Sequence, residues 1–332
     1  MKKTGTKDWM SDFKEILTEG ELNNEKGIIK AVTGGNNVST HICKLWDGVI
    51  IWANEIHLNY IEYPGYDMSN LKFAVLNICQ KGRCEVNLVD DKYIYMVPGS
   101  LCISNTVPKD GYIYPGELYE GLEIAFDLDA LKQQSIPELT AYGLEVDDIT
   151  NCIKNNTKSY IASVSDIVMD KSKALYDALR NKKLSIQEYK FYVLDLLFNL
   201  RHGGITDIRN KSLVTKGQRS IAVEAERIIT KDISKHYTVE EIAGRFNVSP
   251  SALKKYFDAV YGMPISYYVK EKRMKKAMEM LVLPGTSVGE VANHCGYENQ
   301  GKFGAAFKAY VGTTPLEYRR IQTAMNMSKI FE

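Results

Sequence analysis

The chain has 332 residues, a net charge of +1, and a composition in which 45% of the residues are hydrophobic and 25% are charged. This length exceeds what one ordinary core accommodates, so about two domains are expected. Because no run of about 18 uncharged apolar residues occurs, we expect neither a transmembrane helix nor a secretion signal, and we predict a cytoplasmic protein without a membrane partner.

The six cysteines are scattered along the chain, which favours a reducing compartment. The close pair, Cys79 and Cys84, lacks the spacing and the neighbouring histidines of a zinc site, so no metal and no cofactor is predicted.

The charge is divided unevenly along the sequence. Residues 217–332 hold 17 Lys and Arg against 12 Asp and Glu, whereas residues 1–216 hold 25 against 29. A basic C-terminal part is suited to face phosphates, and a mildly acidic N-terminal part is not.

The first half of the chain has the pattern of short strands. Residues 41–63 and 71–127 contain brief apolar runs, and residues 1–35 resemble an arm with a little helix. Turn formers at regular spacing are typical of a small sandwich or barrel. They fall at Gly82, Asp90-Asp91, Pro98-Gly99, Asp110-Gly111 and Pro115-Gly116. Residues 71–79 are almost continuously apolar, which predicts an inner strand.

From about residue 165 the apolar period becomes helical, and one apolar stripe follows a helix predicted over 185–201. Two interpretations stay open, namely packing against the preceding barrel and contact with a second copy of the chain. The residues predicted for the dimer contact are Tyr189, Val193, Leu196, Leu197 and Leu200. The polar stretch that follows, residues 202–217, is typical of an interdomain linker.

The last hundred residues contain an internal repeat. TVEEIAGRF, which begins at Thr238, aligns with SVGEVANHC, which begins at Ser287. Downstream of one extra turn residue, Leu253, Phe257 and Gly262 align with Phe303, Phe307 and Gly312. One structural unit therefore occurs twice.

Each copy has the local signals of two helices that cross tightly. Thr238 with Glu241, and Ser287 with Glu290, form capping boxes that start the first helix. Small Ala243 and Ala292 permit close approach of a second helix, which Ser249 and Pro250 begin in the first copy. Inward Leu253 and Phe257 then leave Ser251, Lys254 and Lys255 pointing outward.

A short helix with outward polar and basic residues, held across a preceding helix, has the geometry that enters the major groove of DNA. A plain helical hairpin is the alternative for a single copy, but two copies in a basic segment favour DNA binding. The pattern of residues 265–283 predicts one long helix. It would separate the two groove-entering helices, called the first and second readers below, by about one turn of DNA.

Residues 218–322 resemble the DNA-binding domain of AraC/XylS bacterial transcription regulators. The resemblance is carried by two motifs, TVEEIAGRFNVSPSALKKYFDAVYGMPISYYVKEKRMKKAMEML and SVGEVANHCGYENQGKFGAAFKAYVGTTPLEYRR. The resemblance implies base contacts by Ser251, Lys254 and Lys255 in the first copy, and by Gln300, Gly301, Gly304 and Ala305 in the second. It implies phosphate contacts by Arg273, Lys302, Lys308 and Arg319.

The second copy departs from the family pattern, because Gly304 and Ala305 offer no long donor and an interior glycine costs a helix about 1 kcal/mol relative to alanine. The first reader is therefore expected to dominate specificity. Gln300 is the candidate to pair with adenine, and Ala305 to contact a thymine methyl.

The resemblance also implies a cupin-like barrel ahead of the DNA-binding part, with QKGRCEVNL, VPGSLCIS and YEGLEIAFDL as its best segments. Such a barrel binds a small-molecule effector or mediates dimerisation. Its candidate pocket residues are aromatic: Trp52, Tyr93, Tyr95, Tyr112, Tyr114 and Phe126. An effector-independent dimeric regulator is the alternative.

A metal-dependent cupin enzyme is the rival from another class. Its site needs clustered His and carboxylate ligands, whereas His41 and His57 lie far apart and no His-x-His occurs. We therefore predict that the chain is not an enzyme.

The sequence as a whole predicts an α+β multidomain protein. The expected parts are an arm and barrel over 1–160, helices over 161–202, a linker over 203–217, the double helix-turn-helix domain over 218–322 and a tail over 323–332. The expected function is that of a transcription activator that works as a homodimer on double-stranded DNA, with RNA polymerase as a further partner.

Overall fold

The computed structural model describes residues 23–25, 28–33, 37–62, 72–88, 91–106, 111–145, 159–206 and 213–328. The chain divides into two compact units, Met1–Leu213 and Val214–Glu332, and each is described by itself. The part of the predicted arm that precedes residue 23 lies outside the described residues. Residues 23–25 and 28–33, where that arm was expected to continue, form two strands instead.

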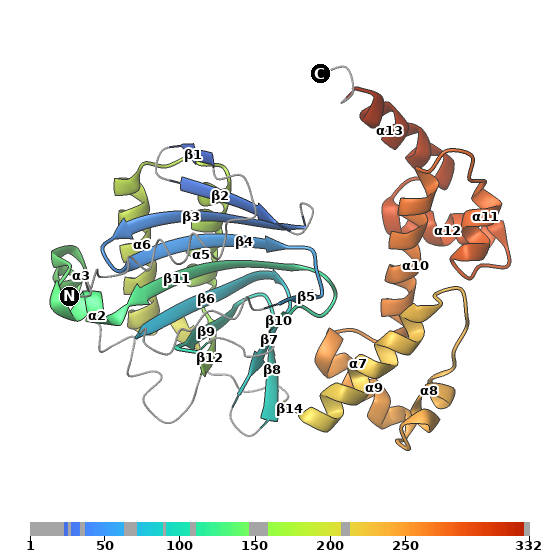
Figure 1. The fold of residues 1–332 in the computed structure, drawn as a ribbon, viewed down its shortest axis with the longest axis horizontal. Coiled ribbons are helices and arrows are strands. Elements are labelled where there is room, and N and C mark those ends of the chain that lie inside the picture. Colours follow the sequence, from blue (N-terminus) through green and yellow to red (C-terminus); the bar gives the residue numbers. More distant parts are fainter. Residues whose placement is uncertain are drawn as a thin grey trace, which may run out of the picture. The chain divides into compact units, whose positions relative to one another are not determined.

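The N-terminal unit is built on a large antiparallel sheet (Figure 1). The order of its described strands is β1-β2-β3-β4-β11-β6-β9-β12-β13. Their bounds are β1 (Asn23–Glu25), β2 (Ile28–Thr33), β3 (Val38–Trp46), β4 (Val49–Ile56), β6 (Phe73–Gly82), β9 (Ser100–Ser104), β11 (Tyr119–Asp127), β12 (Ser159–Val164) and β13 (Ile205–Thr206). Strand β6 lies between β11 and β9, which confirms the predicted inner strand.

Two small antiparallel pairs accompany this sheet. Strand β5 (Tyr60–Ile61) pairs with β10 (Tyr112–Ile113), and β7 (Cys84–Asn87) pairs with β8 (Lys92–Met96). The predicted turn glycines all have positive φ, and Gly82 shows why one of them is needed. A Cβ at Gly82 would lie 1.9 Å from the Leu118 carbonyl oxygen, so another residue would clash with the backbone.

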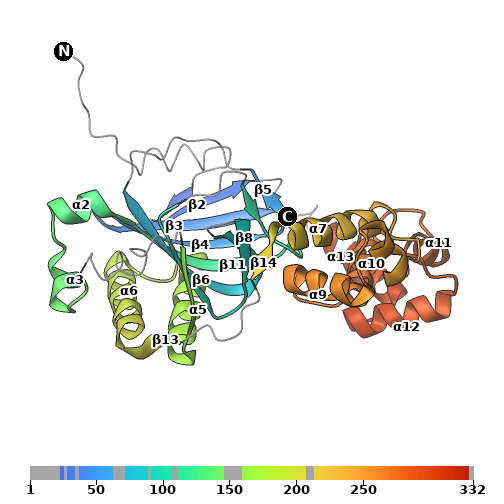
Figure 2. The ribbon, with the colours of Figure 1, turned by 90° about the horizontal axis from the view of Figure 1, so that it is seen from below.

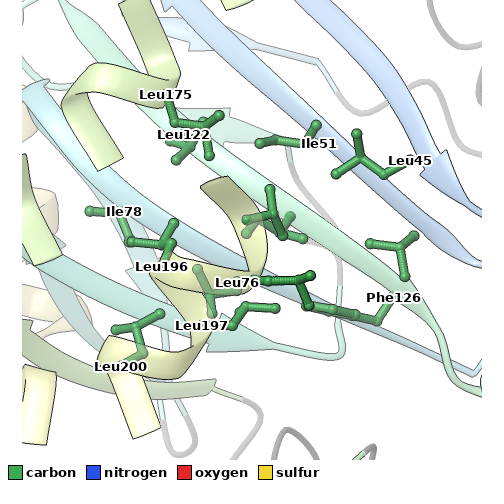
Figure 3. Packing of buried hydrophobic residues seen from close by; sticks show 14 of the residues in the cluster. Leu45, Ile51, Leu76, Ile78, Leu122, Phe126, Leu175, Leu196, Leu197 and Leu200 are labelled. Carbon is green, nitrogen blue, oxygen red and sulfur yellow. The ribbon is translucent and has the colours of Figure 1, made fainter. Parts of the chain in front are cut away.

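Helices cover one face of the sheet. The two helices across this face are α5 (Asp166–Arg180) and α6 (Ile186–Asn199), and α6 continues into the π-helical turn η2 (Leu200–Gly204). The short helices α2 (Leu128–Gln133) and α3 (Pro137–Ala141) follow β11 at one end of the sheet. Figure 3 shows Leu196, Leu197 and Leu200 packed with Leu76 and Ile78 of β6. This core joins the helices to alternate residues of the central strands.

The apolar stripe of α6 belongs to this core, so the dimer contact predicted for it is wrong. Its five residues, Tyr189, Val193, Leu196, Leu197 and Leu200, are all buried in the cluster that the helices share with their own sheet. A side chain already packed inside its own unit offers no surface to a second chain. The alternative interpretation, packing against the preceding sheet, is the one that the structure adopts.

The predicted linker is shorter than expected. Residues 200–206 complete η2 and pair β13 with β12, and the C-terminal unit begins with β14 (Val214–Thr215). Helix α7 (Lys216–Lys231) follows at once, because Thr215 and Gln218 form a capping box that the sequence reading missed.

After β14, the described part of the C-terminal unit is helical. After α7 come α8 (Val239–Arg245), α9 (Pro250–Tyr261), α10 (Ile265–Leu281), α11 (Val288–His294), α12 (Gln300–Val311) and α13 (Pro315–Ser328). Helix α13 therefore extends into the segment predicted as a tail. A β-rich N-terminal region followed by a helical region with two helix pairs joined by α10 confirms the predicted fold class. None of the described helices has the length and apolar character needed to span a bilayer.

Candidate nucleic-acid interface

Both predicted capping boxes are present at the first helix of each pair. The Thr238 hydroxyl accepts from the Glu241 backbone N–H, and the Glu241 carboxylate accepts from the Thr238 N–H at 2.7 Å. Ser287 and Glu290 repeat this arrangement, also with a 2.7 Å bond to the Ser287 N–H. These bonds hold the pKa of each carboxyl below its ordinary value, so both carboxylates stay ionised at the positive end of a helix dipole.

The turns that follow bring in the second helix of each pair. Asn247 and Gly296 adopt positive φ between the helices. Ser249 caps α9 by accepting from the Ala252 N–H at 3.2 Å, with Pro250 at the first helical position, as predicted. Asn299 caps α12 by accepting from the Lys302 N–H at 3.0 Å, which the sequence reading did not identify.

The inward faces of α9 and α12 decide which residues face outward. Leu253 and Phe257 are fully buried, and so are their counterparts Phe303 and Phe307. Because these positions point inward, the predicted base-contacting side chains Ser251, Lys254, Lys255, Gln300 and Ala305 are exposed, as is Gly301. In Figure 2, α9 and α12 both lie along the lower edge of this unit.

The second reader is poor in long donors. Gly304 is half-buried, and a Cβ placed on it would meet no heavy atom within 4 Å. Packing therefore does not require the glycine. Lys302 and Lys308 on the same helix are exposed, so they remain available for the predicted phosphate contacts.

Arg273 does not have the predicted role of a phosphate contact. Its side chain is buried on α10, where burial lowers its pKa, and it donates to two backbone carbonyls. Nε donates to Ile233 O at 2.9 Å, and Nη2 donates to Lys235 O at 3.1 Å. A guanidinium that is enclosed and committed to two carbonyls cannot also reach a DNA phosphate.

Arg319 in the second copy occupies a different position in the repeat, but it also donates to two backbone carbonyls, and these bonds replace its predicted phosphate contact. From α13, Nε donates to Leu281 O at 2.8 Å and Nη2 donates to Thr286 O at 2.7 Å. Each arginine thus fixes the segment that precedes the first helix of a pair.

Further contacts join the two helix pairs directly. His236 Nε2 lies 2.9 Å from Gly296 O, which can only accept a hydrogen bond. Gly296 has φ +73°, and a Cβ there would lie 2.6 Å from both Arg273 Nη2 and Ser234 O. The loop of the second pair is thus held against the entry segment of the first.

The aromatic residues predicted for an effector pocket do not form one group. Phe126 is buried in the core beneath the helices, so it is removed from the predicted pocket. Trp52 packs with Ile42, Ile50 and Ala125, and Tyr114 packs with Tyr119 in a separate cluster. The remaining residues lie on the short strands: Tyr93 and Tyr95 on β8, and Tyr112 on β10.

A row of polar residues that the sequence reading missed crosses the face of the sheet opposite the helices. Glu123 on β11 lies between Asn77 of β6 and Trp52 of β4 in the strand register. Asn54 Nδ2 donates to Glu123 Oε1 at 2.7 Å, and Trp52 also bonds this carboxyl. Desolvation raises the pKa of Glu123 to about 7. The available signal was a charged residue at an alternate position within an apolar strand.

Further hydrogen bonds extend this row. Thr40 Oγ1 donates to Asn54 Oδ1 at 2.7 Å, and Tyr119 Oη donates to Asn77 Oδ1 at 2.6 Å. Over the part of the chain that the structure describes, no group of three or more His, Cys, Asp or Glu residues is arranged to hold a metal ion.

Comparisons with known proteins concern the C-terminal unit. Residues 242–321 match the family model of a helix-turn-helix domain. The porin thermoregulatory protein EnvY of Escherichia coli K12 is 37% identical over 92 residues, 28% of this chain and 36% of EnvY. The HTH-type transcriptional regulator GadX of Escherichia coli O6:H1 is 36% identical over 92 residues, 28% of this chain and 33% of GadX.

Among solved structures, the C-terminal domain of AraT, a response regulator from Geobacillus stearothermophilus, is 33% identical. The match covers 30% of this chain and 84% of that one, with a TM-score of 0.30.

Two capped helix pairs joined by one long helix define the C-terminal unit as a double helix-turn-helix DNA-binding domain. The family model and these relatives confirm the resemblance of this unit to the AraC-type DNA-binding domain that the sequence indicated. The matched segment spans about a third of the length of the two curated relatives.

Proposed function

We propose that the chain is a sequence-specific transcription regulator that inserts α9 and α12 into successive major grooves of double-stranded DNA. The observation that carries this proposal is the exposure of the same helix face in both copies, with Lys254 and Lys255 at the first. GadX, whose name describes an HTH-type transcriptional regulator, aligns over this unit. Activation of transcription and contact with RNA polymerase are part of the proposal.

Substitutions on the two readers test the proposal. A DNA site is first selected from random duplexes with the full chain, and affinities for this site and for a scrambled one are measured over a range of salt concentrations. Lys255→Ala is expected to reduce the preference for one base position by about 1–3 kcal/mol, because a bidentate base contact is lost. Lys308→Ala is expected to weaken both duplexes equally and to lower the salt slope by about 1.

The two substitutions are each other's control, since each removes one exposed lysine from a recognition helix. Equal loss on selected and scrambled duplexes for both variants would refute the assignment of base contacts. If the wild-type chain selects no motif at moderate salt, the proposed sequence-specific regulation is refuted as well.

We further propose that a small-molecule effector binds at the polar row on the sheet face opposite the helices. The row combines hydrogen-bonding groups at Glu123, Asn54 and Asn77 with the apolar surface of Trp52, a combination common to small-molecule sites. Of the aromatic residues predicted to line the pocket, Trp52 is retained in this proposed site. An effector-independent regulator is the alternative outcome of the test.

A thermal-shift screen of the full chain against a metabolite library tests the effector site. A ligand at about 100 times its dissociation constant is expected to add about 2.7 kcal/mol to the free energy of unfolding. Trp52→Leu is expected to abolish this shift, and Phe126→Leu to preserve it, because Phe126 lies on the opposite face of the sheet. Absence of any stabilising compound, or equal loss of the shift in both variants, would favour the effector-independent regulator.

A further inference from the structure

A basic hollow lies in the C-terminal unit, apart from the faces of α9 and α12 that are assigned to base contacts. It has a volume of about 490 Å³ and lies among the end of α7, the segment 232–237 and the end of α8. This volume is within the range of about 300–1,000 Å³ that small-molecule sites occupy. Four cationic side chains line it: Arg227, Lys231, Lys235 and Arg245.

Two of these cations already have acidic partners. Arg227 Nε donates to Glu224 Oε2 at 2.8 Å, and Lys235 Nζ lies 3.9 Å from Asp232 Oδ2. Within the described ranges, neither Lys231 nor Arg245 forms an ion pair within 4 Å, although Arg245 also interacts electrostatically with Glu241 on its own helix. The hollow therefore has two positive charges that its own acidic residues do not pair.

The remaining walls are apolar or aromatic. Ile228 and Tyr237 contribute to the lining, and the Arg245 guanidinium lies 5.8 Å from the centroid of the Tyr237 ring. Asp232 also lines the hollow, but its carboxylate accepts from Ser234 Oγ at 2.6 Å and from the Ser234 backbone N–H. A concave site with two unpaired cations beside an aromatic ring suits a compact anion with a flat apolar body.

We propose that this hollow binds a small organic oxyanion, with its phosphate or carboxylate group between Lys231 and Arg245 and its apolar part against Tyr237 and Ile228. Both cations donate charge-assisted hydrogen bonds, and the arginine fork suits two oxygens of one group. The segment that forms one wall, residues 232–237, is the one that Arg273 and His236 attach to α10 and to Gly296. An occupant would therefore lie against the attachment between the two readers.

Calorimetric titration of the full chain with phenyl phosphate, in the absence of DNA and at constant ionic strength, tests the proposal. Wild type is expected to bind saturably, and more tightly than it binds inorganic phosphate, which lacks the ring. The double variant K231Q/R245Q is expected to bind about tenfold more weakly or worse, because two charge-assisted hydrogen bonds are lost. The matched control K254Q/K255Q removes the same charge from the face of α9 and should bind like wild type.

Failure of wild type to saturate, or equal weakening in both double variants, would overturn the proposal. A second experiment, with DNA, distinguishes a small ligand from the DNA backbone as the source of the oxyanion. K231Q/R245Q is expected to keep the wild-type salt slope on a selected duplex. A slope lower by about 2 would mean that these cations hold DNA phosphates instead, which also overturns the proposal.

Discussion

Replacing Arg273 with methionine is expected to destabilise the C-terminal unit by about 2–5 kcal/mol, because a buried side chain loses both of its hydrogen bonds to backbone carbonyls. The carbonyls are those of Ile233 and Lys235, and the methionine side chain fills part of the volume without bonding them. The measurement is denaturant unfolding of the full chain followed by far-UV circular dichroism. Tryptophan fluorescence reports the N-terminal unit separately, since all three tryptophans precede residue 60.

Two variants control this experiment. Lys276→Met removes an exposed cation from the same helix, so it should change stability little. Arg273→Lys keeps the charge but lacks the planar fork that serves both carbonyls, so it should recover only part of the loss. If Arg273→Met is as stable as wild type but binds DNA with a lower salt slope, the phosphate contact predicted from the sequence is correct after all.

Glu123→Gln is expected to stabilise the N-terminal unit at about pH 8 by on the order of 3 kcal/mol, and to have little effect near pH 4.5. Burial raises the pKa of Glu123 to about 7 from an ordinary value of 4.5. Between these values the folded state holds more protons than the unfolded state, so wild-type stability falls as the pH rises. Above the folded pKa the carboxylate is charged in both states, and the full cost of burying it remains.

The titratable groups near Glu123 do not change their charge in the pH range over which Glu123 titrates. Cys84, Tyr114 and Tyr119 all have their pKa raised by burial, so they stay neutral as Glu123 titrates. The measurement is urea unfolding by tryptophan fluorescence at a series of pH values. Glu120→Gln, which alters an ion-paired carboxylate on the same strand, is the control. A pH dependence that persists unchanged in Glu123→Gln would contradict the assignment.

The sequence predicted the features of the C-terminal unit that depend on neighbouring residues. Capping boxes, a proline at the first helical position and a repeated apolar spacing involve groups only three or four residues apart, so they are visible without a fold. The outward positions of α9 followed from Leu253 and Phe257 for the same reason. The duplication then made DNA binding more plausible than a single hairpin could.

The arginine contacts could not be predicted in this way. Arg273 and its carbonyl partners are separated by 38 and 40 residues, and on a helix rich in lysine the arginine looks like one more solvated cation. Arg319 was misjudged for the same reason. Only the folded arrangement shows that both cations are directed at backbone carbonyls.

The N-terminal unit was predicted less completely because strand faces depend on register. Turn glycines located the strands, but β11 has an irregularity between Glu120 and Gly121 that shifts its pairing with β6. This register places Phe126 beneath the helices and Glu123 on the opposite face. The amphipathic stripe of α6 was likewise clear, but periodicity alone does not distinguish an intramolecular partner from a second chain.

The hydrogen bonds of Arg273 and His236 hold the two helix pairs at one fixed spacing. Helix pairs at a fixed spacing cannot adjust to a duplex whose grooves are spaced differently, so such a duplex would have to bend or twist in order to contact both pairs. The energy of that deformation depends on the base steps between the two contacted stretches. Under the proposed mode of binding, the stiffness of bases that no side chain touches would therefore contribute to the choice of binding site.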